Sequence, residues 1–212
     1  MVAIGASAGG LDAFRKLIEN LPVDTDMAFV LLSHILRGSS SLLPEILARS
    51  TSMPVTQATD GVRLCPNQIY VLPPDKFMEI RGGALYLLPR PHKPVNDAIN
   101  HFLFSLAKDN VQGSVGIILS GEGSDGAEGI TLLKSEGGGV TMAQMPKSAS
   151  SDSMPINAIQ VDHVDYILSP KDIALKLASM SCSEFNEKKA PLKVLWMKGA
   201  AISGPKPSAP LH

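Results

Sequence analysis

Residues 2–10 read VAIGASAGG, a short apolar run that leads directly into a glycine-rich turn. Apolar residues then recur at helical spacing over 11–21, so this stretch predicts a strand, a tight turn and a helix in immediate succession. Apolar runs at 28–32 and 115–119 have the composition of central parallel strands, which are buried on both faces. The repeated alternation predicts an α/β fold with a doubly wound, mainly parallel sheet and helices on both of its faces.

The rest of the chain continues this alternation and adds one different motif. Two apolar segments at 77–80 and 84–88 flank Gly82-Gly83 and predict a small antiparallel hairpin. Elsewhere, helical periodicity predicts helices and short apolar runs predict strands. The helices are expected at 42–47, 95–106, 127–133 and 171–180, and the strands at 68–72, 140–144 and 166–168.

The character of the chain changes near residue 181. Residues 1–180 carry the regular periodicity and are expected to form one folded domain. Residues 181–212 contain four prolines and show no sustained periodicity. We expect this second segment to be a linker or tail that is partly disordered.

Composition and charge exclude several classes of function. The 212 residues carry 19 Lys and Arg against 20 Asp and Glu, a formal net charge of −1, which offers no basic footprint for nucleic acid. No apolar run approaches the roughly 18 residues that a membrane span needs, so no membrane insertion is expected. The two cysteines are too few for a disulfide framework or a four-thiolate zinc site. This cysteine usage predicts a cytoplasmic protein.

The turn after the first predicted strand presents a candidate nucleophile. Gly5-Ala6-Ser7-Ala8-Gly9 fits the Gly-x-Ser-x-Gly pattern, in which a sharp strand-to-helix turn places a serine hydroxyl at the carboxyl edge of a sheet. The helix N-terminus behind Ser7 supplies free N–H groups, which suit an oxyanion or a phosphate. A glycine-rich turn of this kind is also compatible with dinucleotide binding, so the motif alone leaves both interpretations open.

Two further loops supply the partners that a serine nucleophile needs. His34 follows the strand predicted at 28–32, and Asp125 follows the strand predicted at 115–119. The carboxyl ends of neighbouring parallel strands share one crevice, so Ser7, His34 and Asp125 are expected to meet there. In a Ser-His-Asp triad, Ser7 attacks, His34 shuttles the proton and Asp125 holds the imidazole. Each residue taken alone has a simpler interpretation. His34 could be an ordinary loop histidine, and Asp125 could be the N-cap of the helix that follows it.

Together these motifs resemble one known family. VAIGASAGG at 2–10, Ser33-His34 after an apolar strand, and LSGEGSDG at 119–126 are similar to the catalytic domain of the CheB family of chemotaxis protein-glutamate methylesterases. IYVLPP at 69–74 extends the resemblance, which covers residues 1–178. The resemblance implies a doubly wound α/β domain that hydrolyses glutamate γ-methyl esters of chemoreceptors and releases methanol, without a metal or cofactor. It also implies deamidation of receptor glutamines.

The same resemblance implies the residues of the site. Ser7, His34 and Asp125 would form the catalytic triad, and the backbone N–H groups of Ala8 and Glu122 would line the oxyanion hole. The chain departs from the family pattern at two positions, because Ala8 stands where a threonine is frequent and Glu122 where a methionine is frequent. Backbone donors survive these changes, but a carboxylate at 122 would repel a developing oxyanion if it pointed inward.

Partners also follow from the resemblance. It implies methyl-accepting chemoreceptors as the macromolecular substrate. Members of the family usually follow a receiver domain, or occur in hybrids of CheB with the methyltransferase CheR and sensor domains. Because the fold starts at residue 2, we expect this chain to be part of a longer protein of one of these kinds.

Two other functions are hypotheses at this stage. One is a catalytically weak signalling module of the same fold, which binds a receptor or a partner domain without turnover. The other is a nucleotide-binding domain. Against the latter, Ser7 occupies the second glycine position of Gly-x-Gly-x-x-Gly, and Asp24 and Asp26 precede the second strand instead of following it.

Overall fold

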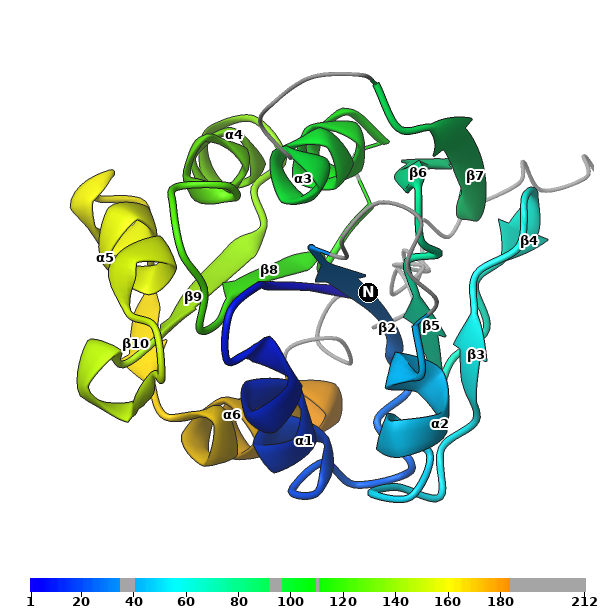
Figure 1. Ribbon diagram of the computed structural model, residues 1–212, viewed down its shortest axis with the longest axis horizontal. Helices are drawn as coiled ribbons and strands as arrows, with labels where there is room; N and C mark the ends of the chain where they lie inside the picture. Colours follow the sequence, from blue (N-terminus) through cyan, green and yellow to red (C-terminus); the bar gives the residue numbers. More distant parts are fainter. Residues whose placement is uncertain (35–40, 92–96, 110, 184–212) are drawn as a thin grey trace, which may run out of the picture.

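A parallel sheet between two layers of helices forms the body of the molecule (Figure 1). The computed structural model describes residues 1–34, 41–91, 97–109 and 111–183, with side chains through residue 180. The sheet contains β1 (Val2–Ala6), β2 (Ala28–Ser33), β3 (Val55–Gln57), β5 (Gln68–Val71), β8 (Val115–Ile118), β9 (Val140–Gln144) and β10 (Tyr166–Leu168). The seven strands lie in the order β10-β9-β8-β1-β2-β5-β3, and neighbouring strands are parallel.

Helices cover both faces of this sheet. One face carries α1 (Gly10–Ile18), α2 (Leu43–Leu47) and α6 (Pro170–Ser183), and the other carries α3 (Ala98–Asp109), α4 (Ala127–Ser135) and α5 (Ser153–Gln160) (Figure 1). The predicted doubly wound α/β fold is therefore confirmed, with a main sheet that is parallel throughout.

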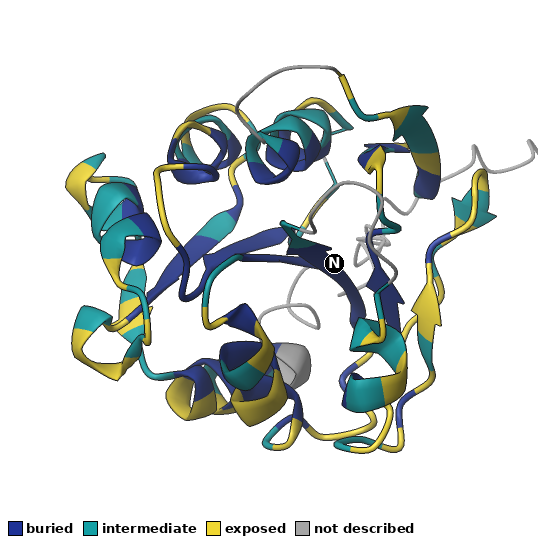
Figure 2. Ribbon diagram, viewed as in Figure 1, coloured by how far each residue is buried: buried dark blue, intermediate teal, exposed yellow. Residues whose placement is uncertain are grey.

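Burial explains why the central strands read as continuous apolar runs. Every residue of β1 is buried (Figure 2). Successive side chains of this strand belong to the cores on opposite faces of the sheet. Ile4 packs in one cluster with Phe14 of α1, whereas Ala3 packs in the other with Ile99 and Phe102 of α3. The helices show the complementary pattern, with one buried and one exposed side (Figure 2).

The predicted hairpin is confirmed as part of a second, smaller sheet. Strands β4 (Val62–Arg63), β6 (Lys76–Arg81) and β7 (Ala84–Pro89) form an antiparallel sheet in the order β4-β7-β6. Gly82 and Gly83, with φ of 55° and 74°, make the two-residue turn between β6 and β7. Phe77 and Ile80 of β6 pack against the α3 layer.

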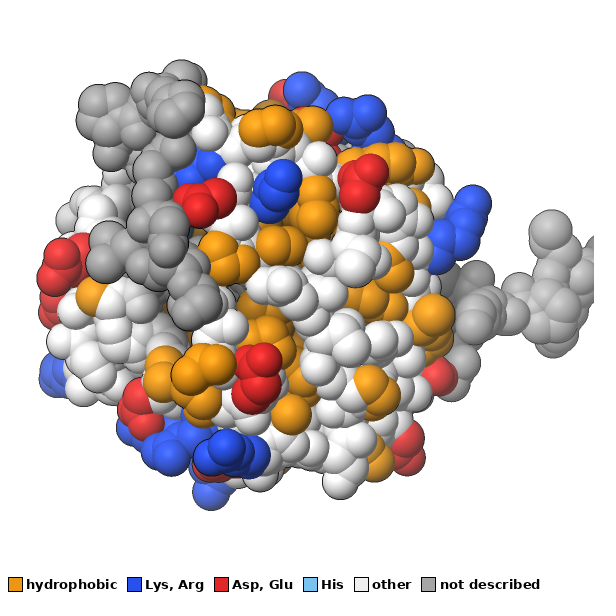
Figure 3. Space-filling model, turned by 45° about the vertical axis from the view of Figure 1, so that its right-hand side comes forward, with side chains coloured by type: hydrophobic (Ala, Val, Ile, Leu, Met, Phe, Trp, Pro, Cys, Tyr) orange, Lys and Arg blue, Asp and Glu red, His pale blue; other side chains and the backbone are white. Residues whose placement is uncertain are grey.

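Four short elements have no counterpart among the sequence-based expectations: β3, β4, α5 and a 3₁₀ turn at Pro146–Ser148. The predicted tail begins inside α6, which ends at Ser183, and residues 184–212 lie outside the described residues. Within the described ranges no helix combines the length and the apolar character that crossing a membrane requires. On the face shown in Figure 3, acidic and basic side chains are interspersed among hydrophobic and uncharged ones.

Candidate active site at the carboxyl edge of the sheet

The predicted site residues lie on loops that leave three adjacent strands at the same edge of the sheet. Ser7 directly follows β1 and His34 directly follows β2, and the last residues of these strands, Ala6 and Ser33, are partners in the register. The backbone N–H of His34 donates to the carbonyl of Ala6 at 3.4 Å. On the other side of β1, the loop after β8 carries Asp125. The helices that follow β1 and β8 pack on opposite faces, so this edge is a topological switch point.

His34 and Asp125 are in direct contact. His34 Nε2 lies 2.7 Å from Asp125 Oδ2, and the two side chains are 17% and 6% exposed. The Asp125 carboxylate also accepts the backbone N–H of Ile99 at 2.9 Å and that of Asn100 at 2.8 Å. Asp125 therefore caps a helix, but the helix is α3 and not its own α4. The expectation that Asp125 caps the helix that follows it is therefore wrong, because its carboxylate binds His34 and the first turn of α3 instead.

Asn100 completes a reciprocal arrangement between the two helices. Its Oδ1 accepts the backbone N–H groups of Gly126 at 2.9 Å and Gly129 at 2.8 Å, at the start of α4. The loop before α4 thus caps α3 through Asp125, and the first turn of α3 caps α4 through Asn100. Because the Asp125 carboxylate binds His34 and two backbone N–H groups at the start of α3, it is held from several directions.

The turn that carries Ser7 is fixed through its backbone. The Ser7 N–H donates to the carbonyl of Ser120 at 2.9 Å, and the Ser7 carbonyl accepts the N–H of Gly10 at 2.8 Å. Gly9 has φ of 73°, and a Cβ there would lie 2.7 Å from Ser150 Cβ, so the turn requires glycine at this position. Ser7 is half-buried. Among the described residues, neither the Ser7 hydroxyl nor His34 Nδ1 makes a hydrogen bond. In hydrolases without bound substrate, the hydrogen bond between the serine hydroxyl and the histidine is often long.

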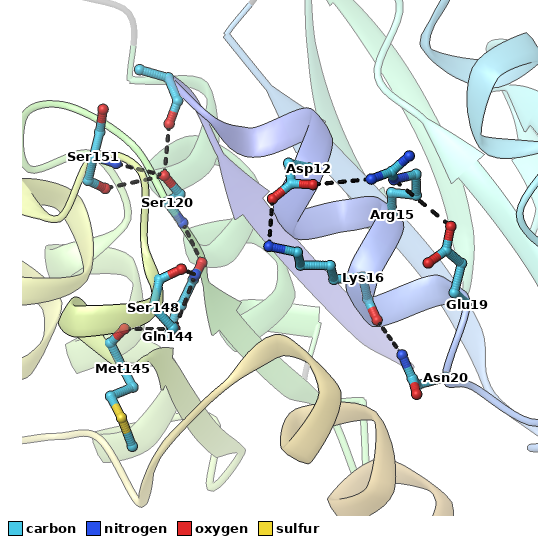
Figure 4. Close-up of polar contacts among 11 residues, drawn as sticks. Asp12, Arg15, Lys16, Glu19, Asn20, Ser120, Gln144, Met145, Ser148 and Ser151 are labelled. Atoms are coloured by element: carbon cyan, nitrogen blue, oxygen red, sulfur yellow. Dashed lines mark hydrogen bonds and ion pairs between the residues drawn. The ribbon is translucent and has the colours of Figure 1, made fainter.

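A buried serine joins the Ser7 turn to the β8 loop. Ser120 Oγ donates to the carbonyls of Ala8 at 2.8 Å and Ser151 at 3.2 Å, and it accepts the N–H of Ser151 at 3.0 Å (Figure 4). The Ser120 N–H donates to Oε1 of the buried Gln144 at 2.8 Å (Figure 4). Sequence reasoning missed Ser120, Gln144 and Ser151 as supports of the site. One available signal was the place of Ser120 inside the quoted LSGEGSDG motif.

The two predicted oxyanion donors are the backbone N–H groups of Ala8, in the Ser7 turn, and of Glu122, in the loop after β8. The N–H of Ala8 belongs to the peptide whose carbonyl, that of Ser7, is tied to Gly10. The position of a Cβ on Gly121, next to Glu122, is 3.0 Å from Ser7 Cβ, so the β8 loop approaches Ser7 closely. Neither Ala8 N–H nor Glu122 N–H donates to another residue of the described part of the chain. Glu122 itself is exposed.

Some other polar features of the molecule involve none of the predicted site residues. A cavity of about 330 Å³ between β6 and α3 is lined by Glu79, Arg81, His101 and Lys108, among others. Hydrogen bonding from Arg81 lowers the pKa of Glu79 despite partial burial.

The residues with described side chains include no group of three or more His, Cys, Asp or Glu that could hold a metal ion. The ion pairs of Asp12 with Arg15 and Lys16 lie on the exposed side of α1 (Figure 4).

Comparison with models of known families gives a match over most of the chain. Residues 2–177 match the model described as CheB methylesterase. The chain belongs to the CheB methylesterase family. The match spans β1 through most of α6 and therefore includes the loops that carry Ser7, His34 and Asp125.

Curated relatives in the CheB family bear a double name. The protein-glutamate methylesterase/protein-glutamine glutaminase of Photorhabdus laumondii subsp. laumondii is 35% identical over 176 residues, which are 79% of this chain and 49% of that protein. The protein of the same name from Salmonella typhimurium is 33% identical over 193 residues, or 87% of this chain and 54% of that protein. The chain thus spans about half the length of these relatives.

A solved structure supports the assignment of this chain to the CheB fold. The crystal structure of the Thermotoga maritima CheB methylesterase catalytic domain superimposes with a TM-score of 0.76 at 26% sequence identity. The alignment covers 84% of this chain and 97% of that domain. The aligned part of this chain therefore spans nearly all of that catalytic domain.

Proposed function

We propose that this chain is a serine hydrolase that removes methyl groups from glutamate γ-methyl esters of chemoreceptors and releases methanol. The observation that carries the proposal is the 2.7 Å contact between His34 and Asp125, at the sheet edge where Ser7 sits on the neighbouring strand end. The names of the relatives support the substrate class, and they add glutamine deamidation as a second reaction that we propose for the same site.

In the first half of the reaction, Ser7 Oγ attacks the ester carbonyl carbon while its proton passes to His34. Asp125 engages Nε2 of His34, so Nδ1 is the ring nitrogen left to accept that proton. The negative Asp125 carboxylate stabilises the imidazolium and fixes the tautomer. The N–H groups of Ala8 and Glu122 donate to the oxyanion, and His34 then protonates the departing methoxide to give methanol and an acyl-enzyme.

In the second half, water replaces the leaving group. His34 removes a proton from the water molecule, the resulting hydroxide attacks the acyl carbon, and the Ser7–acyl bond breaks. His34 returns the proton to Ser7 Oγ, and the products are a glutamate γ-carboxylic acid and free enzyme. With a glutamine substrate the same sequence releases ammonia in place of methanol. No cofactor takes part in either reaction.

The same proposal covers the partners of the chain and the compartment in which it acts. Methyl-accepting chemoreceptors are the partners, and a receiver or methyltransferase domain is the expected neighbour in a longer chain, since the chain spans only about half of its curated relatives. The site of action is the cytoplasm, in keeping with a chain that has two cysteines.

The proposal is tested by methanol release from membranes that contain methylated chemoreceptors. The wild-type chain should release methanol, and the Ser7→Ala variant should lose activity by about 10⁴-fold or more while it still binds the membranes. If both proteins bind and neither releases methanol from receptors that a known methylesterase demethylates, the chain is a binding module and the hydrolase proposal is wrong.

A further inference from the structure

Helix α5 holds the loop that carries one proposed oxyanion donor. Ser153 Oγ donates to the carbonyl of Gly121 at 3.3 Å and accepts the N–H of Gly123 at 3.0 Å. The backbone N–H of Met154 donates to the same Gly121 carbonyl at 2.9 Å. One hydroxyl therefore bridges the residues on both sides of Glu122.

This bridge sets the direction of the Glu122 N–H. That N–H belongs to the peptide whose carbonyl is Gly121, and in a planar trans peptide the C=O and N–H point in opposite directions. Because Ser153 and Met154 hold the carbonyl toward α5, the N–H points away from α5 and donates to no described residue.

The loop needs an external support of this kind. Gly121 and Gly123 flank Glu122, and Gly123 adopts φ of 84°, a conformation that glycine reaches without strain but does not enforce. Gly123 is exposed, and a Cβ there would meet nothing within 4 Å, so packing does not restrain it. Asn157 Nδ2 adds one bond to the Gly123 carbonyl at 2.8 Å. Without the Ser153 hydroxyl, the Met154 N–H still binds the Gly121 carbonyl, but the Gly123 N–H loses its partner and the Glu122 peptide loses one of its two restraints.

We propose that Ser153 is a positioning residue for the oxyanion hole, which acts by orienting the N–H of Glu122. This inference rests on the proposed hydrolase function and adds a residue to it. Ser153 touches no reacting atom; its effect passes through the peptide that it holds. Preorganised donors matter because they need no rearrangement as the oxyanion forms. The N-cap residue of α5 is Asp152, whose side chain makes no capping hydrogen bond, so loss of the Ser153 hydroxyl removes no side-chain cap from this helix.

The test compares Ser153→Ala, Ser153→Thr and Ser169→Ala by the rate at which a fluorophosphonate probe labels Ser7. The probe phosphonylates an activated serine with loss of fluoride, its phosphoryl oxygen occupies the oxyanion hole, and mass spectrometry locates the adduct. Ser169 lies between β10 and α6, and its Oγ accepts the N–H of Asp172 at the start of α6. In the sheet, β10 is two strands away from β8. Ser169→Ala therefore serves as the control, because it also removes one hydroxyl at the start of a helix.

Ser153→Ala should be labelled about 10- to 100-fold more slowly than wild type, the range expected for a displaced donor. Ser153→Thr, which retains the hydroxyl, should be labelled at close to the wild-type rate, and so should Ser169→Ala. In methanol release, Ser153→Ala should lower kcat by a similar factor with little change in KM. Equal labelling of Ser153→Ala and wild type overturns the inference, as does an equal loss in Ser169→Ala. This outcome can be distinguished from failure of the hydrolase proposal, because in that case the wild-type chain itself would release no methanol.

Discussion

Replacement of Asn100 by alanine removes two hydrogen bonds at the start of α4 and leaves every proposed catalytic group intact. Asn100 Oδ1 accepts the N–H groups of Gly126 and Gly129 at 2.9 and 2.8 Å. The N-cap residue of α4 is Gly126, which has no side chain to serve as a substitute. The backbone N–H of Asn100 that binds Asp125 survives in the variant.

The size of the effect follows from these two bonds. Each contributes about 1 kcal/mol net, so Asn100→Ala should lower the free energy of unfolding by about 2 kcal/mol. For a domain of this length that corresponds to a fall in Tm of about 4–8 °C. Because the freed turn contains Asp125, a small displacement of the carboxylate from His34 should lower kcat about tenfold.

Thermal and urea unfolding measure the stability change, with two matched variants. Asn100→Asp keeps an acceptor at the N-terminus of α4, where negative charge is favourable, and should retain near wild-type stability. Asn20→Ala removes a single exposed bond to the carbonyl of Lys16 and should change the free energy of unfolding by no more than about 0.5 kcal/mol. If Asn100→Ala melts within about 1 °C of Asn20→Ala, the reciprocal capping contributes nothing and the reasoning is refuted.

Three further changes test other contacts. Asp125→Asn should lower kcat for methanol release about 10⁴-fold, since an amide cannot accept from His34 and both α3 N–H groups together; an unchanged kcat would remove Asp125 from the triad. Gly5→Ala should lower the free energy of unfolding in urea by about 1–3 kcal/mol, because the new Cβ would lie 2.5 Å from Cγ2 of the buried Ile99; unaltered stability would contradict this packing. Burial opposes ionisation of Asp165, but hydrogen bonds from Lys134 and Thr141 outweigh it and lower the pKa below 3.8. Asp165→Asn should therefore destabilise by about 1.5–3 kcal/mol at neutral pH, and the difference from wild type should disappear as the pH falls through the folded-state pKa; a constant difference would count against the carboxylate.

The elements that the sequence predicts well are those with a strong apolar pattern. β1, β2 and β8 are buried along their whole length or nearly so, and such strands must be continuous apolar runs. β3 escaped prediction because it is a three-residue edge strand with two exposed residues, which leaves no pattern to detect. The same holds for α5, whose eight residues include Pro155 and carry no long periodic stretch.

The site also has features that the sequence predicts and features that it does not. The loops of Ser7, His34 and Asp125 could be assigned to one edge because strand order and direction suffice for that. That Asp125 would cap α3, or that Ser120 would link the Ser7 turn to Ser151, depends on side-chain contacts between distant segments. No local spacing encodes such contacts, and the role of Ser153 proposed above belongs to this class.

The separation of the site residues along the chain has a consequence for refolding. His34 and Asp125 are 91 positions apart, and β1, which carries Ser7, pairs with both β2 and β8. No hairpin or single βαβ unit contains the site, so a collapsed intermediate with only local structure has no assembled nucleophile. Non-local parallel pairing is the slow part of folding such a sheet. We therefore expect recovery of probe labelling at Ser7 after dilution from denaturant to require pairing of β1 with both β2 and β8, and to lag behind recovery of helical circular dichroism.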